Sequence, residues 1–306
     1  MHISRRMGLN LVVLLVLLYV VAPQVGKFKS SVRLLEQTQV NWLLVALACA
    51  LSSYLLASLM YCLLAKKPLT FGRTLLVQLA STFANRLLPA GVGAIGVNYD
   101  YLRKRQHTAA QAGAVVAANN TLGFVGHFAL LGGALLLTRS PLGAISWPHG
   151  SKIAYEAAAL AIAVAIIIFW FAKLRHSFAR TVKNILKNLV TYRVHPLRLG
   201  TALLSSMALT CAYVLCLLAC AAAVKLHIDF VQALIVLTAG VVSGTVTPTP
   251  GGLLGAEAGL VAGFVALGSS SADALAAVLL YRLLTYWLAL LSGFLAFARA
   301  RSIGYL

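Results

Sequence analysis

The chain alternates long apolar stretches with short polar loops. Runs such as LNLVVLLVLLYVVA and ALAIAVAIIIFWF are far more apolar than a soluble domain needs. Because a helix of about 20 apolar residues spans the hydrocarbon of a bilayer, each such run is a candidate span. The pattern predicts an all-α fold, a polytopic membrane helical bundle that forms one membrane domain over residues 1 to 306. Six full-length spans fit, near residues 8 to 25, 42 to 64, 108 to 137, 154 to 172, 199 to 224 and 274 to 298.

Two further apolar segments, at 71 to 103 and 231 to 268, are interrupted in the middle by proline and glycine. The first break reads PAGVGAIG and the second PTPGGLLG. Backbone groups freed by a helix break are costly in hydrocarbon, so a break persists only where protein buries it or where it lines a wet cavity. A single proline would indicate a simple kink, but these breaks hold several prolines and glycines. We therefore expect both breaks to line a cavity.

The basic loops indicate how these two segments sit in the bilayer. If both segments turn back within the membrane, six basic residues lie on one side: Lys27, Lys29, Arg33, Arg139, Lys152 and Lys225. The central Arg86 and Arg282 belong to neither side, so 17 of the 25 lysines and arginines share the other side. If both segments cross once, the split becomes 10 against 13, which carries almost no orientation signal. The bias favours two re-entrant hairpins, in a plasma-membrane protein with both termini in the cytoplasm.

The same assignment of loops to the two sides gives the hairpins opposite orientations. The first hairpin enters from the cytoplasm and the second from outside. This is the inverted-repeat pattern of transporters. The breaks also align, with Gly91, Gly93 and Gly96 opposite Pro250, Gly252 and Gly255, and Asn98 opposite Glu257. The chain is then expected to have eight membrane segments. Its first half covers 1 to 172 with hairpin 71 to 103, and its second half covers 199 to 306 with hairpin 231 to 268.

Composition and charge narrow the classes of function. The chain is 61% apolar and 10% charged, with a formal net charge of +19. The basic residues cluster in short loops beside spans, where they report orientation and contact with anionic lipid, so nucleic acid is not an expected partner. The linker at 173 to 198 places Phe178, Val182, Ile185 and Leu189 along one stripe. This predicts a basic amphipathic helix on the cytoplasmic leaflet, with a solvated basic loop as the alternative.

Few charged residues lie at membrane depth, and these are Arg86, Glu257 and Arg282. Burying each costs at least about 2.5 to 3.5 kcal/mol on the insertion scale, so each should pair or meet a ligand. A purely structural ion pair of Glu257 with Arg282 stays open beside a role in binding. Even then Arg86 is left over, which gives the site a net positive charge suited to a phosphate. Each break also begins a short helix, whose N-terminal amides attract anions.

The remaining polar residues give weaker signals. Asn120 and His127 are seven apart and lie on one helical face with Phe124 between them, a placement that often only ties helices together. His127 alone does not predict a metal site. The five cysteines show no Cys-x-x-Cys spacing, so no disulfide, metal or cofactor is expected. A repeat of glycine at every fourth position predicts close helix packing on one face. Its members are Gly251, Gly255, Gly259 and Gly263.

Four motifs together resemble the flippase-like family that shares the membrane region of lysylphosphatidylglycerol synthetases. They are PTPGGLLGAEAGL, YRLLTYWLALLSG, NRLLPAGVGAIGVNYDYL and NNTLGFVGH. The resemblance covers nearly the whole chain and implies a multi-span integral membrane protein of the lipid flippase class. The chain departs from the family pattern at Ala94, where many members carry an acidic residue, and near Asp100, where many carry a basic one. The matching positions include Asn85, Pro89, Asn120, His127, Pro248, Pro250, Gly251, Gly252, Glu257 and Arg282.

Residues and resemblance together predict an integral membrane lipid translocase for an anionic or polyprenyl-phosphate-linked lipid. The expected substrate-binding residues are Arg86, Pro89, Gly91, Gly93, Asn120, His127, Pro248, Pro250, Gly251, Gly252, Glu257 and Arg282. An intramembrane lipid-modifying enzyme is the second interpretation, but such chemistry needs paired carboxylates, a metal cluster or a nucleophile with a base. No catalytic residue is predicted. A third interpretation is a non-catalytic partner of an enzyme that makes lipid or cell-envelope glycan.

Overall fold

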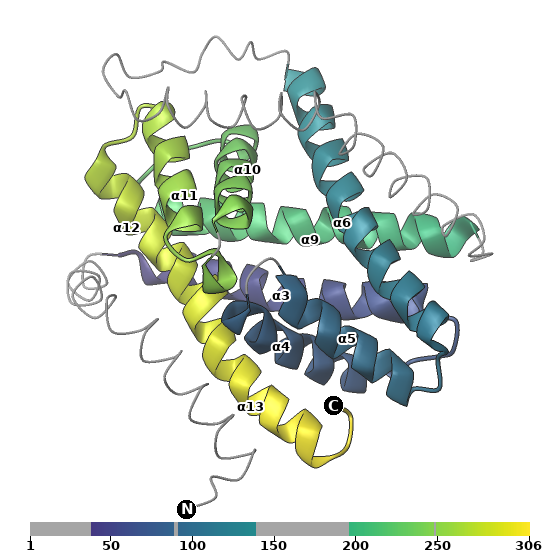
Figure 1. Cartoon of the computed structure of the whole chain (residues 1–306). Coiled ribbons are helices and arrows are strands. Elements are labelled where there is room, and N and C mark those ends of the chain that lie inside the picture. Colours follow the sequence, from purple (N-terminus) through teal and green to yellow (C-terminus); the bar gives the residue numbers. More distant parts are fainter. Residues whose placement is uncertain (1–37, 89–90, 139–195, 248) are drawn as a thin grey trace, which may run out of the picture.

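The computed structural model describes residues 38 to 88, 91 to 138, 196 to 247 and 249 to 306, and every regular element there is a helix (Figure 1). Four helical stretches in this part of the chain are long and apolar enough to cross a bilayer. They are α3 (Val40–Leu64), α6 (Ala109–Thr138), α9 (Pro196–Ala223) and the continuous run of α12 (Ser271–Arg282), η5 (Leu283–Trp287) and α13 (Leu288–Ser302).

These four stretches coincide with four of the six expected spans. The helix α9 begins at Pro196, a residue favoured at a first helical position, so the last residues of the expected linker belong to this helix. The expected spans at 8 to 25 and 154 to 172 lie outside the described residues. The rest of the linker at 173 to 198 also lies outside them.

Both interrupted segments form a pair of short helices that pack against each other. The first pair is α4 (Phe71–Leu87) and α5 (Val92–Lys104). The second is α10 (Phe230–Val246) and α11 (Gly255–Ala266), with the short 3₁₀ turn η4 (Pro250–Gly252) between them. The helices end where the prolines and glycines stand, as predicted. We call these pairs the first and the second hairpin, and the residues between their helices the tips.

The first hairpin begins and ends at the same end of the bundle, because His107 joins its two outer ends. The backbone N–H of Lys67 donates to His107 Nε2 at 3.2 Å, and His107 Nδ1 lies 3.1 Å from the carbonyl oxygens of Leu102 and Arg105. His107 is buried, and burial lowers the pKa of its ring below the usual value. The ring is therefore neutral near pH 7, with its proton on Nδ1.

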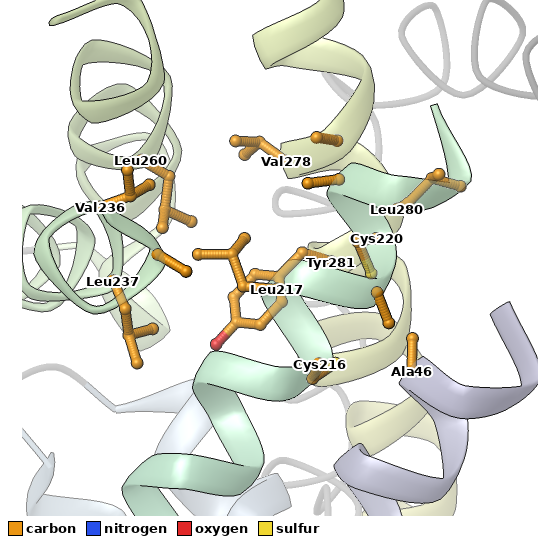
Figure 2. Close-up of a cluster of buried hydrophobic side chains, with 14 of the residues drawn as sticks. Ala46, Cys216, Leu217, Cys220, Val236, Leu237, Leu260, Val278, Leu280 and Tyr281 are labelled. Atoms are coloured by element: carbon orange, nitrogen blue, oxygen red, sulfur yellow. The ribbon is translucent and has the colours of Figure 1, made fainter. Parts of the chain in front are cut away.

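The second hairpin opens at the opposite end of the bundle. There the N–H of Gln39, just before α3, donates to the carbonyl of Ala223 at the end of α9 (3.3 Å). The outer ends of α10 and α11 share one hydrophobic core with the first half of α3, with Ala223 and with α12. Figure 2 shows Leu217, Leu260 and Tyr281 pointing into this core. The two hairpins are thus inverted relative to each other within the bundle.

Small residues allow α10 and α11 to lie in close contact. A Cβ added at Gly259 would lie 2.5 Å from the carbonyl oxygen of Ala239, and one at Gly263 would lie 3.0 Å from the Cα of Val236. On the facing helix, a Cβ at Gly244 would meet the Cβ of Ala256 at 3.0 Å. The expected packing face is confirmed at Gly255, Gly259 and Gly263, whereas Gly251 contacts other elements.

The two ends of the bundle differ sharply in charge. One end holds nine basic residues of the described chain: Lys66, Lys67, Arg73, Arg103, Lys104, Arg105, Arg198, Arg299 and Arg301. We call it the basic end. Its parts are tied together by Tyr305, whose ring lies 4.5 Å from the Arg105 guanidinium and 5.6 Å from that of Arg73. The other end, called the far end, holds Lys225 with Asp229 and Asp273 among the described residues.

This asymmetry generates a topology prediction. In a cysteine-free variant, a single cysteine at Lys104 should be shielded from an impermeant thiol reagent in intact cells, whereas one at His227 of the far end should be labelled. Both positions flank a hairpin, and permeabilised cells serve as the control in which both react. Labelling of Lys104→Cys in intact cells would show that the basic end faces outward.

The close contact of α10 with α11 generates a second prediction. The variant Gly259→Ala should lower the free energy of unfolding by about 1 to 3 kcal/mol, because the added methyl group overpacks the helix contact. Gly132→Ala on α6 is the matched control, since nothing lies within 4 Å of a Cβ there. Thermal unfolding in detergent measures both. Equal stability of the two variants would contradict the tight packing.

Candidate functional site

The tips of the two hairpins meet inside the bundle. A Cβ added at Gly251 in the second tip would lie 3.2 Å from the Cα of Arg86, near the end of α4, and 2.8 Å from the Tyr286 ring. The backbone of Gly251 adopts φ 60°, a left-handed conformation that glycine tolerates best. Gly251 therefore permits both the sharp turn and the close approach of the first hairpin.

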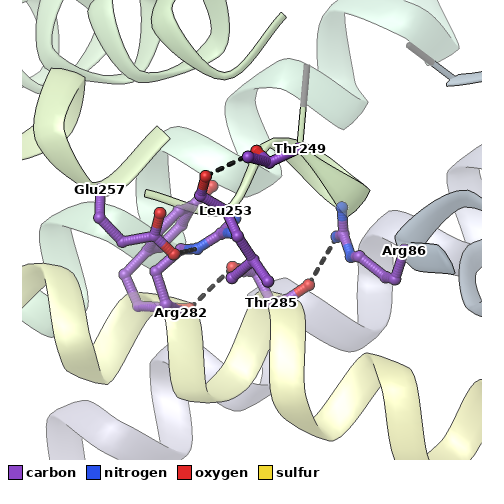
Figure 3. Close-up of polar contacts among 7 residues, drawn as sticks. Arg86, Thr249, Leu253, Glu257, Arg282 and Thr285 are labelled. Atoms are coloured by element: carbon purple, nitrogen blue, oxygen red, sulfur yellow. Dashed lines mark hydrogen bonds and ion pairs between the residues drawn. The ribbon is translucent and has the colours of Figure 1, made fainter. Parts of the chain in front are cut away.

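Two of the predicted charged residues form an ion pair beside this meeting point. The Nε of Arg282 donates to Glu257 Oε1 at 2.7 Å, and the Arg282 and Glu257 side chains are 9% and 19% exposed. Glu257 lies in the first turn of α11, directly after the break, and Arg282 ends α12. Figure 3 shows the two side chains facing each other. The expectation that these buried charges are paired is confirmed.

Arg86 reaches the same region from the first hairpin. Its Nη2 donates to the carbonyl oxygen of Thr285 at 2.8 Å (Figure 3). Its guanidinium also lies 5.0 Å from the centre of the Tyr286 ring, and the guanidinium of Arg282 lies 4.6 Å from that centre. One fully buried tyrosine ring thus contacts two cations, which the negative ring face stabilises. Thr285 and Tyr286 belong to η5, a π-helical turn of a kind found frequently at functional sites.

The polar atoms around this contact are incompletely hydrogen-bonded. Six buried side-chain polar atoms in the described chain have no partner, and five of them lie at the tips or against them. Buried polar groups are normally satisfied, so a cluster of unpaired ones indicates a place for water or a ligand. The five are Asn85 Oδ1, Arg86 Nε, Glu257 Oε2, Arg282 Nη2 and the Tyr286 hydroxyl. We call these five residues the tip cluster.

The charge balance of the tip cluster suits an anion. Two guanidinium groups face one carboxylate, which leaves one positive charge. Free donors remain at Arg86 Nε and Arg282 Nη2. The helices α5 and α11 also begin directly after the two tips, so their positive N-terminal ends lie in the same region. The arrangement can hold an anionic group by hydrogen bonds and charge, without a metal ion. In the described ranges, no three His, Cys, Asp or Glu side chains gather as metal ligands would.

A cavity of about 290 Å³ adjoins the first tip and is lined by α3, α4, α5 and α6. Asn85 faces it, one residue before Arg86. Gly91 lines it as the N-cap residue directly before α5, and Asn120 lines it from α6. The expectation that a break lines a cavity is thus met at the first tip, and the cavity and the tip cluster are neighbours.

The chain has been compared with known protein families. The family model described as the lysylphosphatidylglycerol synthase TM region matches residues 8 to 293. The chain belongs to this family. It is therefore an integral membrane protein of a family concerned with lipid metabolism or transport. A comparison with curated proteins found no match.

In this family member the predicted site residues do not all come together. Arg86, Gly251, Glu257 and Arg282 come together around Tyr286, and Gly91 and Asn120 line the neighbouring cavity. Gly252 packs against Gly244 instead, and Gly93 packs against the backbone of Ala84. His127 lies elsewhere, because its Nε2 pairs with Thr238 Oγ1 at 3.0 Å and ties α6 to α10. Pro250 begins η4, and Pro89 and Pro248 lie outside the described residues.

Sequence reasoning missed two residues of this site. Thr285 and Tyr286 lie three and four positions after Arg282, respectively. That spacing, one turn along an apolar helix, was the available signal, since a tyrosine there must lie close to the buried arginine. Their contact with Arg86 had no signal in the sequence, because Arg86 and Thr285 are 199 positions apart in the chain.

The ion pair generates a stability prediction. Glu257→Gln should lower the free energy of unfolding by about 3 to 5 kcal/mol, because it leaves Arg282 buried without its counter-charge. Adding Arg282→Gln should restore most of that loss, since no uncompensated charge of this pair remains. Thermal unfolding of the two single variants and the double variant in detergent measures the coupling. Additive losses in the double variant would show that the two side chains do not stabilise each other.

Proposed function

We propose that the protein is a lipid translocase that moves an anionic or phosphate-linked lipid between the leaflets of the plasma membrane. Polyprenyl-phosphate-linked lipids belong to the same class, because the phosphate is the group recognised. The observation that carries the proposal is the tip cluster, where two broken helices meet with a net positive charge and five unpaired polar atoms. Ionisable groups at such a position in a membrane protein mark substrate pathways.

In this proposal the two hairpins are re-entrant, and each enters the bilayer from the side at which it opens. The basic end, rich in lysine and arginine, faces the cytoplasm, as the positive-inside rule favours. The tips then meet near the middle of the membrane. Broken helices from inverted elements that meet there are a common arrangement in transporters, whose substrate sites lie at the same depth.

The phosphate group is held by donors that the protein itself leaves unpaired. Arg86 Nε and Arg282 Nη2 supply charged hydrogen bonds, and the N-terminal ends of α5 and α11 add dipole charge. Glu257 keeps the net charge at one, so the site attracts the phosphate without holding it too tightly for release. Transport of this kind breaks no covalent bond, so in this proposal the protein is not an enzyme.

The Glu257 and Arg282 pair is compatible with both a structural role and a role in binding. Its short contact stabilises the fold, while Glu257 Oε2 and Arg282 Nη2 remain without partners. A lipid head group can therefore bind beside an intact ion pair. The same residues fit a lipid-modifying enzyme less well than a translocase. One carboxylate paired with an arginine does not provide the acid and base that such catalysis needs.

The test is a translocation assay with purified protein in vesicles. Phosphatidylglycerol with a fluorescent acyl chain is the probe, and a membrane-impermeant quencher reports movement between leaflets. Arg86→Gln should slow movement at least about tenfold, because a charged hydrogen bond to phosphate contributes about 1.5 to 3 kcal/mol.

The matched control is Arg105→Gln. Arg105 also has an unpaired buried Nε and lies over tyrosine rings, but it stands at the basic end of the bundle. This variant should move the lipid at the wild-type rate. Thermal unfolding of both variants shows whether they are folded. Translocation by folded Arg86→Gln at the wild-type rate would refute the proposed role of the tip cluster.

A further inference from the structure

The cavity beside the first tip is polar but carries no charged side chain. Half of its ten lining residues are amides, namely Gln78, Asn85, Asn98, Asn119 and Asn120. Tyr61 and Ser81 add hydroxyl groups. No lysine, arginine, histidine or acidic residue belongs to the lining. Such a concentration of neutral amides stands out in a chain that is 61% apolar, and within the described chain only Gln78 and Asn98 of the five bond to each other.

Some of these amides hold one another in place. Gln78 Nε2 donates to Asn98 Oδ1 at 2.7 Å, and Asn98 Nδ2 donates to the carbonyl oxygen of Ala94 at 2.9 Å. Both Gln78 and Asn98 are buried, so this wall of the cavity is fixed by α4 and α5. A ligand therefore meets a preformed surface and not one that must first be ordered.

Other amides point to a ligand because their hydrogen-bonding groups are unused. Asn85 Oδ1 is buried and has no partner. Asn119 and Asn120 line the cavity from α6 with no side-chain hydrogen bond recorded within the described chain. An amide presents both a carbonyl acceptor and N–H donors, and a hydroxyl group likewise both donates and accepts. The lining thus matches a ligand with several hydroxyl groups.

The position of the cavity ties this ligand to the anion site. Asn85 lines the cavity, and its neighbour Arg86 reaches the tip cluster. Gly91, which closes the same tip, also lines the cavity. A molecule with its phosphate at Arg86 can extend its next chemical group into the amide lining.

We propose that this cavity receives the part of the lipid head group beyond the phosphate, and that this part is uncharged and rich in hydroxyl groups, such as glycerol or a cyclic polyol. This inference rests on the proposed lipid-translocase function. The volume of about 290 Å³ is near the lower end of small-molecule sites, which begin at about 300 Å³, so it suits a head group without its acyl chains.

Two other head-group chemistries fit the lining less well. An ammonium group is bound best by a carboxylate, yet the cavity lining offers only neutral amide and hydroxyl oxygens and lies beside a cluster of net positive charge. A bare phosphate would leave the amides unpaired. A site built to bind hydroxyl groups discriminates strongly against ligands that lack them, because its own polar groups then stay unsatisfied.

Binding of short-chain lipids to the full purified chain in detergent tests the inference, with thermal unfolding as the readout. Phosphatidylglycerol and phosphatidylinositol have hydroxyl-rich head groups. Phosphatidylserine has the same net charge but an ionised head group, and phosphatidate has no further group. The first two should bind at least about tenfold more tightly than the last two. Equal affinities for all four would overturn the inference.

Two variants assign the selectivity to the cavity. Asn119→Ala and Asn120→Ala should weaken binding of phosphatidylglycerol at least about fivefold and leave phosphatidate unchanged. Both side chains lie outside the tip cluster and neither is buried, so the fold should tolerate these changes. Asn41→Ala, at the exposed start of α3, is the matched control and should change neither affinity. An equal loss of affinity for both lipids would show that the amides stabilise the fold or bind the phosphate, and not the polyol.

Translocation and binding measured side by side distinguish a failure of this inference from a failure of the proposed function on which it rests. Translocation in vesicles without any head-group preference would overturn the inference and leave the translocase function standing. Selective binding of phosphatidylglycerol without translocation of any lipid would overturn the function and keep the head-group assignment. Soluble glycerol 3-phosphate is included as a probe. Stabilisation by it as strong as that by phosphatidylglycerol would show that the ligand is a soluble polyol phosphate and not a lipid.

Discussion

Broken helices inside an apolar bundle must have their free backbone groups covered by protein or water, and this constraint organises the structure. Each hairpin interrupts its helix with proline and glycine, and the second tip packs against the end of α4 and against Tyr286 of η5. Gly251 permits the contact because a larger residue would collide with Arg86 and Tyr286. The inverted arrangement of the hairpins thus brings the second break against the inner end of α4.

The same contact concentrates charge where charge is hardest to bury. Glu257 neutralises Arg282, while Arg86 relies on the Thr285 carbonyl and on the Tyr286 ring. These partners leave several polar atoms of the tip cluster without a hydrogen bond. Its position against a neutral, amide-lined cavity places a charged region beside one whose polar side chains are amides and hydroxyl groups.

The rest of the bundle provides a frame that holds the tips in register. The helices α3 and α9 run antiparallel, with the start of α3 bonded to the end of α9. Glycines let α10 and α11 pack closely, and the buried His107 joins the outer ends of the first hairpin. The contacts of Gln39 and His107 lie at the two ends of the bundle, and the glycine contacts lie along one face of α11. The polar contacts of the tip cluster lie between these ends.

The sequence by itself determined the membrane class, four described spans and the places where helices break, because hydrophobic length and proline or glycine act locally. It also indicated the Glu257 and Arg282 pair, since charges at membrane depth need partners. Only the tertiary structure decided that Arg86 contacts Thr285 and Tyr286, that His127 serves Thr238, and that amides from three helices share a cavity. These contacts join residues far apart in the chain, and no local pattern encodes which distant surfaces will meet.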